Sequence, residues 1–338
     1  MFVYAGIDEA GYGPILGPLV VVRSVFLVDR ADAGNEGGAP AAPPCLWTTL
    51  SSAVARTLRG RQGRLAVADS KALYNASVGL RHLEAGVLGF LGSIGRSEGA
   101  APDGPPGSLD ELFAVMGDPA LRPHGLPWYA DAGGGPELPC AADPEELDAA
   151  AGRLGEAADS AGVALGELKA DVVLEDRFNA RVRELGSKAA CAWASVALHL
   201  QHIWTRFGGL RPLVVIDRQG GRKDYEQGLL SAVAGARVEP LERRDEQSRY
   251  DVRAAERSME VIIRVRGEAA HLPVALASMA AKYLRELFMH RFRRYWRDIA
   301  PEVEPTAGYF VDGRRFLEEI QPHIGRLGID PRALIRCR

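Results

Sequence analysis

Residues 6–18 read Gly-Ile-Asp-Glu-Ala-Gly-Tyr-Gly-Pro-Ile-Leu-Gly-Pro. A short alternating run, residues 2–8, leads into this stretch and predicts a strand that ends in two adjacent acids, Asp8 and Glu9. Two carboxylates at the end of a buried strand are costly unless a positive charge compensates them, and a divalent metal ion is the usual compensation. The glycines that follow let a backbone loop approach a ligand closely. A phosphodiester with its metal ions fits both halves of the stretch.

The strands around this stretch extend the same arrangement. Residues 19–28 predict a second, long strand, and the short gap before it suits two adjacent antiparallel strands. Residues 212–216 predict a buried strand that delivers Asp217 to its carboxyl end, where ligands commonly bind in α/β sheets. An Asx turn that only caps the strand end is the alternative for Asp217, and Asp224 is a nearby substitute.

In the rest of the chain, segments with the two-residue period of strands alternate with segments that have the 3.6-residue period of helices. Strands are expected at residues 163–169, 236–243 and 258–267, and helices at residues 171–206, 273–297 and 312–325. Strands with interleaved helices predict an α/β fold whose mixed sheet, with antiparallel and parallel pairs, is flanked by helices. A glycine- and alanine-rich stretch, residues 31–44, reads as a loop.

Residues 76–162 differ in composition from the rest. Residues 96–141 are dense in Gly and Pro and predict little regular structure, whereas Asp143 and Pro144 read as the N-cap and first residue of a helix. Residues 100–160 carry twelve acidic and two basic side chains; the net charge of the whole chain is −3, so the remainder carries seven net positive charges. A basic body with one acidic segment is compatible with a polyanionic partner.

Bulk composition fits one large domain or two ordinary ones. The chain has 338 residues, of which 47% are hydrophobic and 25% charged, and no run is apolar enough to span a membrane. Its four cysteines have no C-x-x-C spacing, so reduced thiols in a cytoplasmic protein are expected. Dinucleotide-binding loops are excluded because a strand follows residues 11–17, and neither a P-loop nor a G-x-S-x-G elbow occurs.

Two stretches resemble ribonuclease HII, the type 2 ribonuclease H family. Residues 6–20 match its N-terminal signature, G-x-D-E-A-G-R-G-P-x-x-G-P-V-V, except that Tyr12 stands where the family has arginine. Residues 277–286 resemble its A-S-x-x-A-K-x-x-R-D helix, with Glu286 in place of the aspartate. At about 100° per residue, Ser278, Lys282, Arg285 and Glu286 share one polar stripe on an otherwise apolar helix, which solvent alone would also explain.

Weaker matches accompany these two. Residues 69–73, Asp-Ser-Lys-Ala-Leu, resemble the family's D-S-K-K-L, and Lys71 would contact a phosphate. Residues 306–309, Thr-Ala-Gly-Tyr, resemble H-K-G-Y without the His-Lys pair, and Tyr309 would stack beside the sugar next to the cut. A surface lysine and a half-buried core tyrosine are the plain alternatives. The matches fall in residues 1–75 and 163–338, which would form the catalytic domain, while residues 76–162 would be an insertion of unknown role.

The resemblance implies a ribonuclease H-like enzyme. It would hydrolyse the RNA strand of RNA–DNA hybrids, or cut at ribonucleotides in duplex DNA, and leave 5′ phosphates. Asp8, Glu9, Asp217 and Glu286 would hold Mg²⁺ or Mn²⁺. The backbone of Gly11, Tyr12 and Gly13 would read the 2′-hydroxyl, and Lys71, Ser278, Lys282 and Tyr309 would bind substrate. No membrane partner is expected, and we expect a monomer.

Two alternatives stay open from the sequence. A nucleic-acid-binding protein on the same fold that no longer cuts is favoured by Tyr12, Glu286 and the lost His-Lys pair. Against it, four clustered carboxylates would repel phosphates unless they bind cations. Specificity like that of ribonuclease HIII, a sister family with glutamate as its last acid, is favoured by Glu286.

Overall fold

The computed structural model describes residues 1–29, 42–75, 77–98, 104–117, 125–130, 137–220 and 224–337, and within α3 the side chains only up to residue 93. Most of the loop expected at residues 31–44 and much of residues 96–141 lie outside these ranges. The centre of the fold is a seven-stranded sheet in the order β5-β2-β1-β6-β9-β8-β7. Its strands are β1 (Phe2–Ala10), β2 (Leu19–Val28), β5 (Val163–Val173), β6 (Leu213–Asp217), β7 (Arg237–Arg243), β8 (Gln247–Ala254) and β9 (Arg257–Arg264).

The sheet is mixed, as the sequence predicts. Strand β1 pairs antiparallel with β2 and parallel with β6, and β6 pairs parallel with β9. The outer pairs, β2 with β5 and β7 with β8 and β9, are antiparallel. The parallel strands β1, β6 and β9 therefore end at one edge of the sheet, and their carboxyl ends meet there.

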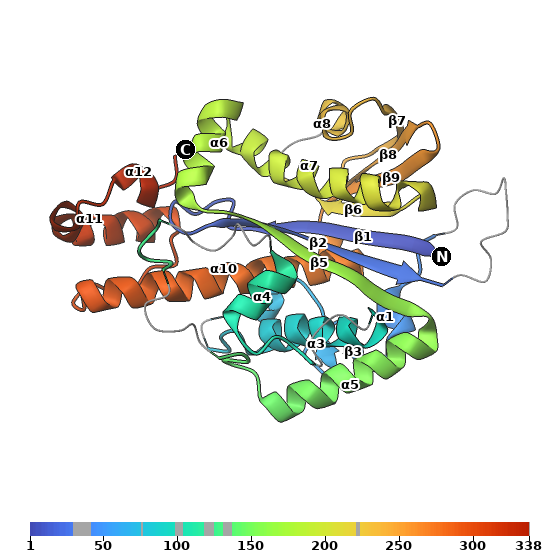
Figure 1. The fold of residues 1–338 in the computed structure, drawn as a ribbon, viewed down its shortest axis with the longest axis horizontal. Coiled ribbons are helices and arrows are strands. Elements are labelled where there is room, and N and C mark those ends of the chain that lie inside the picture. Colours follow the sequence, from blue (N-terminus) through green and yellow to red (C-terminus); the bar gives the residue numbers. More distant parts are fainter. Residues whose placement is uncertain are drawn as a thin grey trace.

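Alternate residues of the central strands face two separate cores. Tyr4 and Val22 belong to one apolar cluster, and Ile7 and Val21 to the other. Figure 1 shows α7 on one side of the sheet and α10, α3 and α5 on the other. The helices of the two sides are α6 (Glu175–Leu185), α7 (Lys188–Phe207) and α8 (Glu226–Ala232), and α3 (Arg81–Glu98), α4 (Leu109–Met116), α5 (Pro144–Ala161) and α10 (Leu272–Ile299).

Short elements and the C-terminal helices complete the chain. They are α1 (Leu46–Thr49), α2 (Ser70–Leu73), α9 (Gly267–Ala270), α11 (Phe310–Leu327), α12 (Pro331–Leu334) and the two-residue strands β3 (Val54–Ala55) and β4 (Leu65–Ala66). None of the described helices is long and apolar enough to cross a membrane.

Helix α10 packs directly on β1. A Cβ atom added to Gly6 would lie 2.2 Å from the backbone carbon of Pro273, so only glycine permits this approach. Further along, Gly11 lies against the Arg285 side chain and Gly17 against Met289. Strand β1 and the loop after it thus run along α10 between residues 273 and 289.

The prediction of one continuous helix over residues 171–206 is wrong at its start and in its middle. Strand β5 continues to Val173, and two helices follow, separated at Gly186 and Ser187. Gly186 has a φ of 81°, which ends α6, and the Ser187 side chain accepts a hydrogen bond from the N–H of Ala190 to cap α7. Small and apolar residues on both helices gave one continuous periodicity across the break.

Residues 76–162 contribute to the core on the side of the sheet that α10 covers. Within them, α4 and residues of α3 and α5 belong to the larger apolar cluster, together with Trp128 and Tyr129. Helix α4 falls in the stretch expected to hold little regular structure. The predicted cap of α5 is confirmed, because Asp143 accepts a hydrogen bond from the N–H of Glu146 and Pro144 follows it. That these residues form an insertion remains a prediction.

Candidate metal-binding and nucleic-acid site

The carboxyl ends of β1 and β6 bring two predicted acids together. Ile7 pairs with Ile216 in the parallel register, so Asp8 and Asp217 leave neighbouring strands at the same level. Asp8 is 7% exposed, while Glu9 and Asp217 are half-buried. Both strands are apolar up to these positions, and burial of the strands carries the carboxylates into the protein.

The three carboxylates at this edge perturb one another. Burial, then the charges of Glu9 and Asp217, raises the pKa of Asp8 well above its usual range. Burial also raises the pKa of Glu9 to about 7, opposed by a hydrogen bond from Gln219. Burial raises the pKa of Asp217, although the N–H of Gly267 donates to it at 2.8 Å. Repelling, desolvated carboxylates of this kind are what a bound cation relieves.

Glu268, which the sequence analysis did not select, joins this group. It lies on the short helix α9, directly after Gly267. Its side chain hydrogen-bonds that of Asp217, and burial together with the charges of Asp217 and Asp69 raises its pKa to about 7. We call Asp8, Glu9, Asp217 and Glu268 the acidic cluster.

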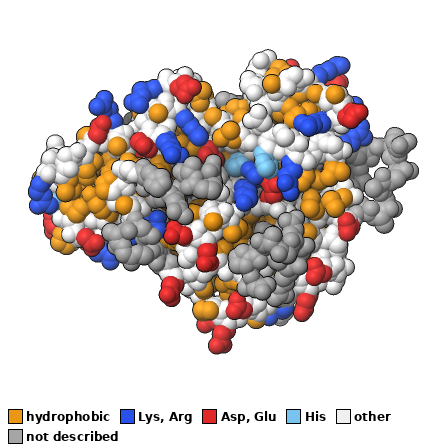
Figure 2. All heavy atoms as spheres, viewed as in Figure 1, with side chains coloured by type: hydrophobic (Ala, Val, Ile, Leu, Met, Phe, Trp, Pro, Cys, Tyr) orange, Lys and Arg blue, Asp and Glu red, His pale blue; other side chains and the backbone are white. Residues whose placement is uncertain are grey.

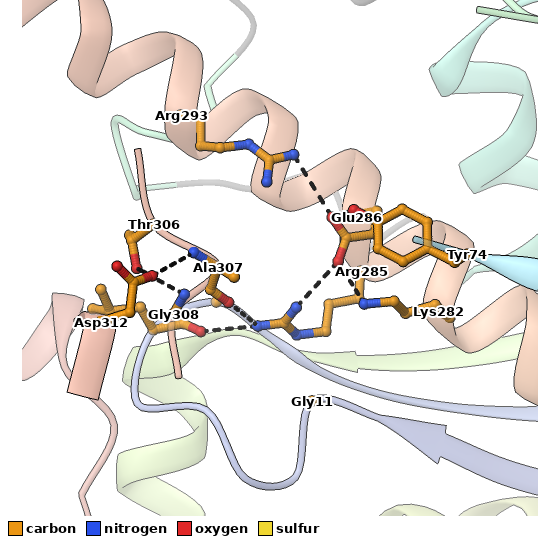
Figure 3. Close-up of polar contacts among 12 residues, drawn as sticks. Gly11, Tyr74, Lys282, Arg285, Glu286, Arg293, Thr306, Ala307, Gly308 and Asp312 are labelled. Carbon is orange, nitrogen blue, oxygen red and sulfur yellow. Dashed lines mark hydrogen bonds and ion pairs between the residues drawn. The ribbon is translucent and has the colours of Figure 1, made fainter. Parts of the chain in front are cut away.

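Glu286 has a different setting, shown in Figure 3. Its carboxylate accepts hydrogen bonds from Lys282 at 2.7 Å and from the Tyr74 hydroxyl at 3.0 Å. Arg285 and Arg293 are also ion-paired with it, at 3.5 and 3.7 Å. Burial acts to raise its pKa, but these three cations outweigh burial and hold the pKa below its usual value.

Helix geometry explains the separation of Glu286 from the acidic cluster. The Ser278 hydroxyl hydrogen-bonds Asp8, and Glu286 lies eight residues further along α10, about 12 Å at the rise of an α-helix. Glu286 is therefore beside the loop that follows β1, and the acid that lies beside Asp217 is Glu268. The Glu286 assignment rested on its motif position, which carries no information on which acid faces the strand ends.

Other predicted residues lie around the acidic cluster. Lys71 is exposed, and its charge lowers the pKa of both Glu9 and Asp217. Ser278 is buried, and its hydroxyl oxygen also lies at hydrogen-bonding distance, 3.2 Å, from that of Ser70. The substitute Asp224 instead accepts from the N–H of Glu226 at the start of α8. Lys71 and Ser278 thus accompany Asp8, whereas Asp224 is occupied by its own helix.

We call Glu286 and the three cations paired with it, Lys282, Arg285 and Arg293, the Glu286 group. The glycine loop, residues 11–17, lies between the acidic cluster and this group. Gly11 has a φ of 87°, and a Cβ there would meet the Pro18 carbonyl at 2.3 Å. Gly13 is exposed, with nothing within 4 Å of where its Cβ would be. Among the described residues, neither the N–H of Tyr12 nor that of Gly13 donates a hydrogen bond. Two backbone donors near the acids are therefore left without an acceptor in the described part of the chain.

A turn at residues 306–309 closes the other side of this loop. Arg285 donates to the carbonyls of Ala307 and Leu16, at 3.1 and 3.3 Å, and so links the turn to the glycine loop (Figure 3). Asp312 accepts from the Thr306 hydroxyl at 2.6 Å and fixes the turn. Tyr309, predicted to stack beside a sugar, is 55% exposed, with the Arg285 guanidinium 6.0 Å from its ring centre.

The donor set of the acidic cluster fits a hard divalent cation. All four groups are carboxylates, the ligands that Mg²⁺ and Mn²⁺ prefer, and three of them are only half-buried. As the side chains stand, no three acidic, His or Cys groups in the described ranges converge closely enough to hold one ion. Ligation by three carboxylates would require side-chain rotation, which partial exposure of Glu9, Asp217 and Glu268 permits.

Comparison with known proteins returned matches among solved structures. No protein-family profile matches the chain, and no curated protein matches it. The PCNA–RNase HII complex from Archaeoglobus fulgidus is 14% identical and covers 100% of this chain and 95% of its own, with a TM-score of 0.44. Ribonuclease H2 from Pyrococcus horikoshii is 14% identical and covers 98% and 92%, with a TM-score of 0.40. RNase H3 from Aquifex aeolicus is 14% identical and covers 98% and 71%, with a TM-score of 0.39.

Proposed function

We propose that this chain is a metal-dependent nuclease of the ribonuclease H kind. It would hydrolyse the RNA strand of RNA–DNA hybrids, or cut at ribonucleotides within duplex DNA, and leave a 5′ phosphate. The observation that carries the proposal is the acidic cluster. At one sheet edge, burial raises the pKa of all four carboxylates, and the charge of Asp217 raises the pKa of the other three further; Lys71 and two backbone N–H groups without an acceptor among the described residues lie beside them.

In this proposal the acidic cluster would hold Mg²⁺ or Mn²⁺, which when bound would activate water and stabilise the leaving 3′ oxygen. Asp8, fixed by the buried strand β1, would be the central ligand, with Asp217 and Glu268 on one side and Glu9 on the other. The Ser278 hydroxyl orients Asp8. Lys71 is placed to contact a backbone phosphate next to the ions.

Recognition of ribose would fall to the glycine loop. The 2′-hydroxyl is the group that distinguishes RNA from DNA, and backbone N–H groups can donate to it. Tyr309 would stack near the sugar, and Lys282 and Arg293, the partly exposed cations that pair with Glu286, would lie toward the nucleic-acid backbone. Tyr12 supplies no guanidinium fork, so weaker discrimination is expected for a single ribonucleotide than for a run.

The deciding experiment is cleavage of labelled duplexes with Mg²⁺ or Mn²⁺. One duplex carries a single ribonucleotide, one a ribonucleotide run and one none, and Asp8→Asn is the control. Cutting only where ribose is present, and only with metal, supports the proposal, and the preferred duplex distinguishes the two ribonuclease types. Equal cutting by a clean Asp8→Asn preparation contradicts the site.

A non-catalytic binding protein is the second candidate. The observation that favours it is that no three carboxylates converge in the described residues as the side chains stand. Tight binding of the hybrid without cutting by either metal, and without heat of Mg²⁺ or Mn²⁺ binding in calorimetry, would establish this second function.

A further inference from the structure

A buried arginine from the C-terminal segment lies directly beneath the glycine loop. Arg336 is 2% exposed, and its guanidinium stacks on the Phe178 ring with 3.8 Å between guanidinium carbon and ring centre. One of its terminal nitrogens donates to the Gly11 carbonyl, and the other donates to the Tyr12 carbonyl at 3.2 Å. No carboxylate is ion-paired with it among the described residues, so its side chain is committed to the loop backbone.

The planarity of the peptide bond gives these two contacts a direction. In a trans peptide unit the C=O of one residue and the N–H of the next point in opposite directions. The carbonyls of Gly11 and Tyr12 point inward to Arg336, so the N–H groups of Tyr12 and Gly13 point outward. These are the two donors that have no acceptor within the described chain.

The remainder of the loop has partners besides Arg336, whose guanidinium also lies 3.4 Å from the Gly17 carbonyl. The N–H groups of Ile15 and Leu16 donate to the Gly308 carbonyl at 2.8 and 3.3 Å, and that of Gly17 donates to Glu175 at 3.0 Å. Within the described part of the chain, the N–H groups of residues 11–13 have no comparable partner, and the carbonyls of Gly11 and Tyr12 are held by the Arg336 side chain. The orientation of these two peptide units therefore depends on one side chain.

The segment that carries Arg336 is itself anchored. The Asn179 amide donates to the carbonyls of Arg332 and Ile335, both at 2.7 Å, and its oxygen accepts from the N–H of Cys337. The N–H of Arg336 donates to the Ile15 carbonyl at 2.9 Å. These hydrogen bonds to the backbone of the segment do not involve the guanidinium, so they would keep the segment in place if the guanidinium were removed.

We propose that Arg336 is a positioning residue for specificity: it orients the peptide units 11–12 and 12–13 so that two N–H groups face the substrate ribose. This inference rests on the proposed function for its substrate, but the orientation of the loop is a property of the protein alone. A guanidinium is required because its planar fork reaches two adjacent carbonyls, whereas an ammonium on a flexible stem reaches one.

The test compares Arg336→Gln, Arg336→Lys and Arg332→Gln. Arg332 lies on the same segment and is exposed, and Asp330 is the one described residue with which its side chain pairs, so its variant is the matched control. The first readout is the NMR order parameter of the Tyr12 and Gly13 amides. We expect values near about 0.85 in the native protein and the control, below about 0.6 in Arg336→Gln, and intermediate values in Arg336→Lys.

The second readout is the ratio of affinities for an RNA–DNA hybrid and the matched DNA duplex, measured with Ca²⁺. Arg336→Gln should lower this ratio roughly tenfold while affinity for DNA stays the same, since one lost hydrogen bond between a backbone N–H and the 2′-hydroxyl is worth up to about that factor. An equal loss for both duplexes would mean a general effect on folding and would overturn the inference.

The two readouts separate the two proposals. Rigid Tyr12 and Gly13 amides in Arg336→Gln, or equal loosening in Arg332→Gln, would refute the positioning role whatever the protein binds. A native affinity ratio of one would refute the proposed reading of ribose and leave the order parameters to decide on Arg336.

Discussion

At the scale of single residues, the acidic cluster holds an electrostatic strain that can be measured. Asp8 is buried and surrounded by like charges, so its carboxylate is unfavourable whenever no cation is bound. Asp8→Asn removes that charge and keeps the shape. In a chelating buffer we expect the variant to be more stable than the native protein, on the order of 1 kcal/mol. Urea denaturation with EDTA measures this, and a less stable variant would contradict the electrostatic account.

Glu268 and Glu286 should give opposite results when each is changed to glutamine. Glu268→Gln removes a group of the acidic cluster and should lower any cleavage rate at least about 100-fold with little change in stability. Glu286→Gln leaves three cations without their anion, so it should cost roughly 3 kcal/mol of stability. Cleavage assays and urea denaturation on both variants test this pair of predictions. The reverse pattern would favour Glu286 over Glu268 as a metal ligand in the proposed function.

The sequence predicted three of the four acids because each of Asp8, Glu9 and Asp217 stands at the end of an apolar strand. The sequence analysis did not select Glu268, because this residue lies four positions after the end of its strand, inside a short helix. A signal was present, since the strand predicted at residues 258–267 ends directly before Glu268. What the sequence could not show is that β9 lies parallel to β6, which sends its end to the same edge.

At the scale of elements, the close contact of β1 and α10 holds the acidic cluster against its supporting serine. Gly6→Ala would place a methyl group 2.2 Å from the Pro273 backbone, so α10 would have to shift. We expect a loss of about 3 kcal/mol or more. Gly13→Ala is the matched control, because nothing lies within 4 Å of that position. Equal denaturation midpoints for the two variants would disprove the tight contact.

Helix α6 begins with a buried acid beneath the glycine loop, and this gives a pH prediction. Burial raises the pKa of Glu175 to about 7 from 4.5. A raised pKa means that the folded state holds the proton more tightly, so the stability that Glu175 contributes falls as pH rises from about 4.5 to about 7. Glu175→Gln, which cannot ionise, should gain up to about 3 kcal/mol over the native protein between pH 5 and pH 8. Urea denaturation across this range measures the difference, and a constant difference contradicts the buried ionisation.

Element boundaries were predictable where capping residues mark them and less so elsewhere. The N-cap at Asp143 was found, whereas the break at Gly186 was hidden by continuous apolar spacing. Strand β8 was missed although Arg249, Asp251 and Arg253 alternate with its buried residues, because only two of those buried residues, Tyr250 and Val252, are apolar.

At the scale of the whole molecule, charge is unevenly distributed. Figure 2 shows Asp and Glu side chains gathered over the lower part of this face, where Figure 1 places α5. The chain outside residues 100–160 carries seven net positive charges. We expect affinity for duplexes to fall steeply with salt, roughly tenfold or more between 50 and 200 mM, because counterions are released on binding. Filter binding at several salt concentrations tests this, and a flat dependence would argue against a nucleic-acid partner.

The link between Gly11 and Arg336 joins residues 325 positions apart. Contacts of such long range form late in folding, because the entropy of closing the intervening chain must be overcome before the contact contributes. The sheet can therefore assemble before the glycine loop is set. During refolding, the change in tryptophan fluorescence, which reports compaction, should be complete before selective ligand binding recovers. Simultaneous recovery of the two signals would contradict this order.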